Sequence, residues 1–146
     1  MNILCVSDGS DVGYESANLV AKIIDPKQVG KIAIILIAWP PHKSALWSKA
    51  QDEWLDADDL HEAMEIVVER ELERYRSAFA GHAESIEGSS TDGDPVAQII
   101  ENADRIDADL ILMAITDDGE TGVAQTASEL VLKSSVQVLV ARGRTA

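Results

Sequence analysis

Four continuous apolar segments constrain the fold of this chain more than any other feature of its sequence. They span residues 2–6, 31–39, 109–114 and 136–140. Segments that are apolar on both faces are typical of the central strands of a parallel sheet that helices cover on both sides. A weaker fifth strand is predicted around residues 83–89.

Segments with helical periodicity lie between these strands. Apolar residues recur every three or four positions along residues 12–24 and 60–79, and a short last helix is predicted from Thr126 or Ala127 to Lys133. Asp94 and Pro95 predict the start of a further helix at residues 95–105, with Asp94 as its N-cap.

The alternation of strands and helices predicts one α/β domain over residues 1–146, with a parallel sheet and right-handed crossovers. The only long irregular region, residues 40–51, is predicted to be a mobile flap.

Ligands of open α/β sheets bind beyond the carboxyl ends of the strands, which directs attention to residues 7–10, 39–44 and 115–125. Asp8 offers an acceptor at the end of the first strand, Gly9 allows a tight turn, and Ser10 can cap the next helix. Taken alone, these three residues favour a structural turn with a helix cap over a ligand contact. The glycine loop at residues 119–122 can present backbone N–H groups to an anion, although its pattern alone is weak.

The ordered set of these segments resembles the universal stress protein family over nearly the whole chain. The resemblance is carried by VSDGS at residues 6–10, GDP at 93–95, ADLILM at 108–113 and ASELVL at 127–132. It implies a Rossmann-like open sheet of five parallel strands in the order 3-2-1-4-5, similar to the adenine-nucleotide alpha hydrolases, with helices on both faces. It also implies a homodimer paired through the last strand.

One branch of this family binds ATP and another does not. In the binding branch, an aspartate after the first strand contacts adenine and ribose, and a glycine loop after the fourth strand holds the phosphates. Carried over to this chain, the resemblance implies candidate nucleotide-binding residues at Ser7, Asp8, Ala38, Met113, Ala114, Gly119, Gly122, Gln125 and Thr126.

The phosphate loop departs from the family pattern. The family has a glycine and a hydroxyl residue nine positions after the second glycine, whereas this chain has Leu132 and Lys133 there. Alignment on the closing helix instead places Gln125 and Thr126 at these positions, which shortens the loop and replaces a glycine that can adopt positive φ. Ala114 also replaces the usual glycine after the fourth strand.

The charge of the same loop opposes a triphosphate. It contains Asp117, Asp118 and Glu120, and no Lys or Arg lies between Arg105 and Lys133. Like charges repel more strongly where water is excluded. A bound Mg²⁺ could accept carboxylate and phosphate oxygens together, so ATP with Mg²⁺ is kept as an alternative.

The whole chain is strongly acidic, with 26 acids, 12 bases and a formal charge of −14. This charge argues against nucleic acid and anionic membranes as partners, because both require basic surfaces. It favours solubility by self-repulsion, and a high-salt cytoplasm is a sharper interpretation. The single cysteine, Cys5, is predicted to be a buried apolar residue, which suits a reducing compartment. No signal-peptide pattern and no run long enough to span a bilayer are found, so we expect a soluble cytoplasmic protein.

No pattern of catalytic or metal-binding residues is found. The three histidines are widely separated, and no nucleophile and base share a motif, so we expect neither an enzyme nor a metal protein. Two hypotheses remain: a dimeric stress-response domain that binds ATP weakly, and an adenine-nucleotide-binding switch. Dimerisation is assigned to the β-branched last strand, at Val136, Val138 and Val140, because pairing would cover an apolar edge.

Overall fold

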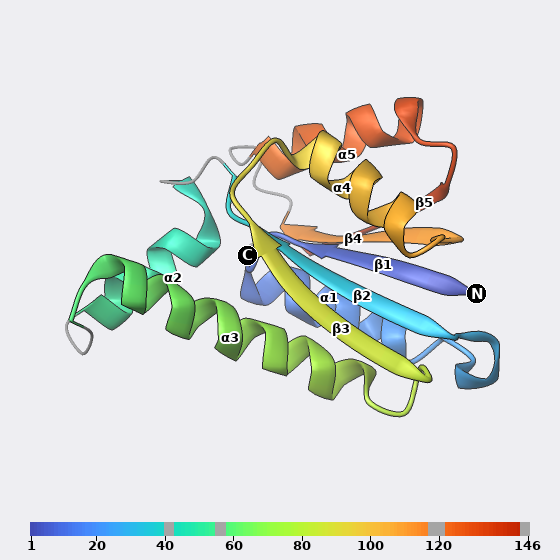
Figure 1. The fold of residues 1–146 in the computed structure, drawn as a ribbon, viewed down its shortest axis with the longest axis horizontal. Coiled ribbons are helices and arrows are strands. Elements are labelled where there is room, and N and C mark those ends of the chain that lie inside the picture. Colours follow the sequence, from blue (N-terminus) through green and yellow to red (C-terminus); the bar gives the residue numbers. More distant parts are fainter. Residues whose placement is uncertain (40–42, 55–57, 117–121, 144–146) are drawn as a thin grey trace.

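A sheet of five parallel strands forms the centre of the molecule (Figure 1). The computed structural model describes residues 1–39, 43–54, 58–116 and 122–143. The strand order is β3-β2-β1-β4-β5, which confirms the predicted fold class and order. The strands are β1 (Asn2–Ser7), β2 (Lys31–Ile37), β3 (Ser85–Thr91), β4 (Leu110–Thr116) and β5 (Gln137–Gly143).

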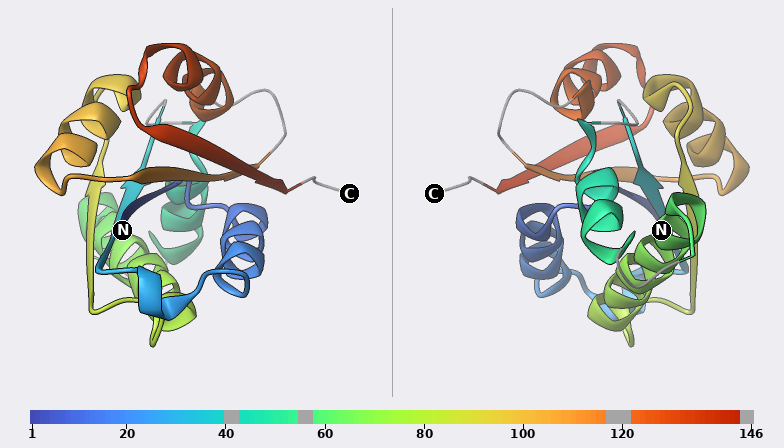
Figure 2. Two further views of the ribbon diagram at one scale, coloured as in Figure 1. Left: turned by 90° about the vertical axis from the view of Figure 1, so that its right-hand side faces the viewer. Right: turned by 90° about the vertical axis from the view of Figure 1, so that its left-hand side faces the viewer.

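Helices cover both faces of the sheet, as Figure 2 shows from two sides. One face carries α1 (Asp11–Ala21), α2 (Ala45–Glu53) and α3 (Leu60–Phe79), and a short 3₁₀ helix, Pro26–Gln28, precedes β2. The other face carries α4 (Pro95–Arg105) and α5 (Gly122–Lys133). None of the helices, as far as the chain is described, is long and apolar enough to cross a membrane.

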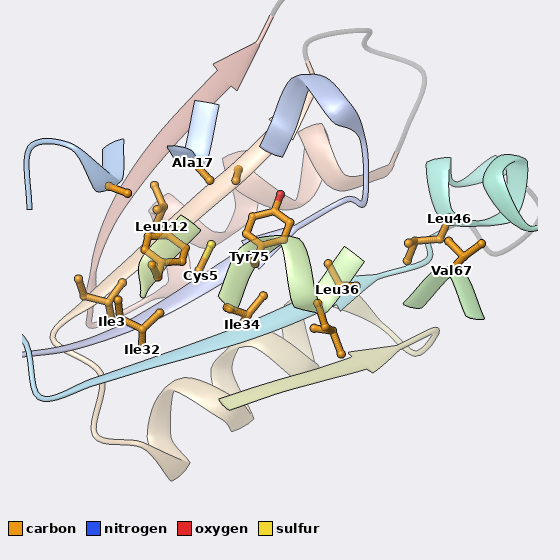
Figure 3. Close-up of a cluster of buried hydrophobic side chains, with 14 of the residues drawn as sticks. Ile3, Cys5, Ala17, Ile32, Ile34, Leu36, Leu46, Val67, Tyr75 and Leu112 are labelled. Carbon is orange, nitrogen blue, oxygen red and sulfur yellow. The ribbon is translucent and has the colours of Figure 1, made fainter. Parts of the chain in front are cut away.

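Alternate residues of the central strands supply the two halves of the core. Ile3, Cys5 and Ile34 point toward α1 and α3, where Tyr75 and Phe79 are fully buried (Figure 3). The residues between them, such as Leu4, Val6 and Ile35, pack toward α4 and α5. Cys5 is fully buried in this core, which confirms the prediction of a buried apolar residue, and the burial raises the pKa of its thiol to about 12.

Two of the predicted helix starts can be compared directly with the structure. Ser10 is the N-cap of α1, where its Oγ accepts a hydrogen bond of 2.9 Å from the backbone N–H of Gly13. Asp94 occupies the N-cap position of α4 as predicted, but its side chain makes no capping hydrogen bond. The fixed φ of Pro95 at the first helical position is therefore the clearer local cause of that start.

The prediction of an irregular flap over residues 40–51 is wrong for its second half. Residues 40–42 lie outside the described part of the chain, but α2 begins at Ala45. Ser44 caps it by accepting from the N–H of Trp47 at 3.1 Å, and Leu46 and Ala50, four residues apart, are both buried. In the sequence, the two prolines just before the cap favoured an irregular segment over a helix with so short an apolar pattern.

The bounds of two other helices also differ from the prediction. The last helix begins at Gly122, several residues before the predicted start at Thr126 or Ala127. The first helix ends at Ala21 rather than at residue 24, because the N–H groups of Lys22, Ile23 and Ile24 make i→i−3 bonds that tighten its end.

A network of charged side chains ties the three helices of one face together. Lys49 of α2 lies 2.8 Å from Asp11 of α1 and 2.9 Å from Glu71 of α3. Arg74 of α3 contacts the same two carboxylates at 2.8 and 3.0 Å, and it stacks 4.0 Å above the ring of Tyr14. Because Glu71 is only 2% exposed, its charge needs both cationic partners.

Candidate functional site

The carboxylate of Asp8 joins the ends of β1 and β4, next to the point where the strand order reverses. Its Oδ1 accepts hydrogen bonds from the N–H and the Oγ of Ser10, at 2.9 and 2.6 Å. Its Oδ2 accepts a bond of 2.8 Å from the N–H of Thr116. The side chain is buried, at 3% exposure, so Asp8 already has protein partners on both oxygens.

The side chain of Ser7, the residue before Asp8, makes its hydrogen bonds within the core. Its Oγ lies 2.6 Å from the hydroxyl of Tyr75 and accepts a bond of 3.0 Å from the N–H of Gly9. Burial raises the pKa of Tyr75 well above its ordinary value, so the phenol stays neutral. The Ser7 side chain therefore fixes the turn after β1 against α3 and has no solvent contact.

Gly9 allows α2 to pack directly on the turn after β1. Its φ is +78°, and a Cβ atom there would lie 2.5 Å from Cγ of Leu46. Leu46 itself is buried beside Val67 of α3 (Figure 3). A glycine at this position is required twice, by the backbone angle and by the close approach of α2.

Thr116 is a site residue that the sequence reasoning missed. It ends β4, its N–H is bonded to Asp8, and its side chain is 5% exposed. Its Oγ1 is buried and has no hydrogen-bond partner among the residues described. A buried hydroxyl without a partner is costly, and it marks a place where a ligand atom or a water would be stabilised. A polar residue at the end of an apolar run was the signal in the sequence.

The remaining candidates divide into three groups. Ala38, Met113 and Ala114 are buried at the ends of the central strands, and Ala114 pairs with Ser7 across β1 and β4. Gln125 is exposed and Thr126 is buried, both on α5, where Gly122 is the first residue. Gly119 lies outside the described residues, as do Asp117, Asp118 and Glu120.

The geometry thus brings Ser7, Asp8, Ala114 and Thr116 together at the carboxyl ends of the two central strands β1 and β4. Within the described part of the chain, no three His, Cys, Asp or Glu side chains are grouped closely enough to hold a metal ion. The arrangement can offer hydrogen-bond partners to a small polar ligand. A nucleophile paired with a general base does not occur among these four residues.

The fold and the position of these residues define a class of protein. It is an open α/β domain with helices on both faces of its sheet and a polar site beyond the first and fourth strands. The sequence model of the universal stress protein family matches residues 1–142. The chain belongs to the universal stress protein family. No curated protein sequence matches it significantly.

Solved structures share the same fold at low sequence identity. A universal stress protein from Lactobacillus plantarum is 19% identical over 97% of each chain, with a TM-score of 0.63. A family protein from Arabidopsis thaliana with AMP bound is 13% identical, with a TM-score of 0.60 over 100% of this chain and 93% of that chain. One from Archaeoglobus fulgidus in complex with dAMP is 20% identical over 96% of each chain, with a TM-score of 0.55. At these identities the likeness establishes the fold alone.

Proposed function

We propose that this chain is a regulatory, stress-response domain that works as a homodimer, catalyses no reaction and binds ATP weakly. The observation that carries the proposal is that both carboxylate oxygens of Asp8 already accept hydrogen bonds, from Ser10 and Thr116, in a buried position. A nucleotide that used this carboxylate would compete with these internal bonds. The acids at positions 117, 118 and 120 add repulsion toward a triphosphate.

Isothermal titration calorimetry of the purified protein with ATP and Mg²⁺ tests the proposal. We expect no saturable heat up to about 1 mM nucleotide, which corresponds to a binding free energy weaker than about −4 kcal/mol. Saturable binding with a micromolar dissociation constant would contradict the proposal. Mass spectrometry of the protein under native conditions checks that no nucleotide was retained during purification.

A second candidate function, an adenine-nucleotide-binding switch, is favoured by the unpartnered hydroxyl of Thr116. Relatives of this fold have been solved with AMP, dAMP and cAMP, which carry less charge than ATP. For this candidate, Asp8, Met113 and the glycines at 119 and 122 remain the proposed contacts, with Ser7, Ala38, Ala114, Gln125 and Thr126 around them.

Thr116→Val separates the two candidates, because it removes the hydroxyl and keeps the volume of the side chain. If the switch is correct, AMP binds the parent with a measurable affinity and the variant loses about tenfold or more. If Thr116 has no ligand, AMP binds neither protein, and the variant is as stable as the parent or more stable. Asp8→Ala provides a second check, since unchanged AMP affinity in that variant would exclude the switch.

The homodimer is proposed to form along β5. This strand lies at one edge of the sheet, and the proposed contacts Val136, Val138 and Val140 are only partly buried. The exposure of Leu139, at 41%, supports the same edge, and we include this residue among the proposed contacts. Pairing with a second copy would cover this apolar edge and its unpaired backbone groups.

The absence of catalysis and the cytoplasmic location belong to the same proposal. The buried Cys5 thiol suits a reducing compartment. ATP hydrolysis measured beside the Asp8→Ala variant is expected to stay at the background rate for both proteins. Turnover in the parent that the variant lacks would show that the domain is an enzyme.

A further inference from the structure

Two hollows flank the other edge strand, β3, one on each face of the sheet. The hollow on the α3 face has a volume of about 310 Å³, and its lining residues are His61, Met64, Glu65, Val68, Ser90, Thr91 and Asp92. The hollow on the α4 face has a volume of about 240 Å³ and lies between Ala33, Ile35, Glu87 and Ser89 of the sheet and Asn102 and Arg105 of α4. Each is large enough for one or two side chains.

The outer edge of β3 has free backbone groups whose positions follow from its bonds to β2. The N–H of Ser85 donates to the carbonyl of Gly30 at 3.1 Å, and the carbonyl of Thr91 accepts from Ala38 at 3.0 Å. Backbone N–H and C=O groups alternate in direction along a strand, so those of the odd-numbered residues of β3 point toward β2. The N–H and C=O groups of Ile86, Gly88 and Ser90 therefore point away from the sheet.

Glu87 is the only charged residue in the sequence of β3, and it is paired with Lys31 and Arg105. The strand reads Ser-Ile-Glu-Gly-Ser-Ser-Thr, with no proline, lysine or arginine and no bulge in its register with β2. Natural edge strands that must stay single usually carry such features. An extended segment laid along β3 would direct its side chains alternately to the α3 face and the α4 face, where the two hollows lie.

The chemistry of the hollows selects the side chains of the partner. On the α3 face, Met64 and Val68 can cover an aliphatic stem and Asp92 can pair with a cationic head. Glu65 lies 3.1 Å from Nε2 of His61 at an exposed position, and it adds negative charge to the rim of the hollow. On the α4 face, Glu87 and Arg105 already form an ion pair of 2.6 Å, so a small polar residue fits better than a charge. The formal charge of −14 also attracts a basic segment over a distance.

We propose that the outer edge of β3 binds an extended, basic segment of a partner protein by strand addition. Lysine or arginine residues of that segment enter the hollow beside α3, and the small polar residues between them face α4. This surface would give a domain without catalysis a means of output. The proposal does not depend on a nucleotide or on the dimer, and it is measured separately from both.

The probe is a fluorescein-labelled peptide of nine residues that alternates threonine and lysine, with blocked ends. Fluorescence anisotropy with the full chain is expected to give saturable binding in the micromolar range. A peptide of the same composition with its lysines in one block should bind at least about tenfold more weakly, because it cannot place them all on one face. Equal binding of the two peptides would overturn the proposal, since it would indicate charge attraction alone.

Ser90→Pro tests the backbone contact directly. It removes an N–H that points away from β2, so the sheet keeps its internal bonds while the edge loses a donor. We expect at least a tenfold loss of peptide affinity, with an unchanged circular dichroism spectrum. Ser90→Ala is the matched control, because it removes the same side chain and keeps the N–H that points outward, so any loss it shows is the share of the side chain alone. Undiminished binding by a folded Ser90→Pro protein would overturn the proposal.

Two further measurements decide the outcome if Ser90→Pro does not fold. Glu65→Lys reverses one charge of the hollow at an exposed position of α3, and it should weaken the lysine peptide about tenfold and strengthen the same peptide with glutamate in place of lysine. Hydrogen exchange on the parent should show new protection at the amides of Ile86, Gly88 and Ser90 when the peptide is bound. Protection elsewhere, with those three amides unchanged, would place the peptide on another surface.

Discussion

The two edge strands of the sheet differ in almost every property that decides what can bind to them. β5 presents Val138, Leu139 and Val140, and Leu139 is 41% exposed, whereas β3 presents mainly serine and threonine beside two hollows. An apolar edge is covered best by an identical apolar edge, while a polar edge with recesses suits a segment whose side chains fill them. The proposed second copy on β5 and the proposed partner on β3 would therefore not compete for the same edge.

The supports of the two edges differ as well. α1 packs on β4 and β5, and α3 packs on β2 and β3. At the end of β5, Gly143 lies so close to α1 that a Cβ atom would be 1.8 Å from Cγ1 of Val12 and 2.8 Å from its carbonyl oxygen. In β3, a Cβ atom on Gly88 would meet the end of the Leu72 side chain at 2.9 Å. The contact at the end of β5 therefore includes a helix backbone atom, whereas the nearest atoms at Gly88 of β3 all belong to side chains.

The largest expected effect is on the dimer. Leu139→Asp places a carboxylate on an edge that the dimer would bury against its own copy, so we expect the dimer dissociation constant to rise at least about 100-fold. Light scattering at micromolar concentration measures the mass. Ile66→Asp on α3 is the matched control, because Ile66 is 42% exposed in the monomer. A parent that has the mass of one chain at these concentrations would remove β5 as an interface.

The next largest effect is on the free energy of unfolding. Gly143→Ala forces a methyl group against both the side chain and the carbonyl oxygen of Val12. The side chain can change rotamer but the helix carbonyl cannot, so we expect a loss of about 2–3 kcal/mol. Urea denaturation followed by circular dichroism measures this value. A loss below about 0.5 kcal/mol would show that β5 and α1 can separate easily, and it would remove the contrast between the two edges.

A smaller loss is expected from Gly88→Ala in β3. The nearest atoms are the ends of Leu72 and Arg76, which can move by a few tenths of an ångström, so we expect a loss of about 1 kcal/mol or less. The same urea experiment applies, with Gly143→Ala as the reference. A loss from Gly88→Ala that equals or exceeds that from Gly143→Ala would reverse the proposed difference in rigidity.

The smallest effect concerns the link between the two supporting helices. Hydrogen bonds from Lys49 and Arg74 lower the pKa of Asp11 from 3.8 to about 2, so its ion pairs stabilise the protein above about pH 4 and lose this contribution as the pH falls toward 2. Because this carboxylate is 68% exposed, the contribution is about 0.5 kcal/mol. Asp11→Asn should be slightly less stable than the parent at pH 6 and equally stable near pH 2, as measured by urea denaturation. A difference that persists at pH 2 would assign the effect to packing.

Most of the fold could be predicted from the sequence because its signals are local. Apolar segments fixed the central strands, and the alternation with helical periodicity fixed the parallel arrangement. α2 was missed because its evidence is a short buried pair, Leu46 and Ala50, behind two prolines. The serine cap of that helix is visible in the sequence, but the packing of Leu46 on Gly9, which stabilises the helix, joins residues that are far apart in the chain.

The position of the candidate site could be predicted from the sequence, but the hydrogen bonds of its residues could not. Asp8 was found because it follows a buried strand. Its hydrogen bond with the N–H of Thr116 joins residues 108 positions apart. The contact of Ser7 with Tyr75 spans 68 positions and carries no periodic signal in the sequence. Thr116 was overlooked because a strand-terminal threonine is common, and only its burial without a partner makes it unusual.

The sequence by itself determined the class of fold and the membership in a family, and it directed the search for a ligand site to the carboxyl ends of the central strands, because these inferences depend on short-range patterns of apolar and turn residues. Only the tertiary structure decided that Asp8 is already bonded, that Leu139 is the exposed apolar residue of β5, and that hollows flank β3. Each of these facts depends on which distant side chains fill the space around a residue, and packing of that kind leaves no period in the chain.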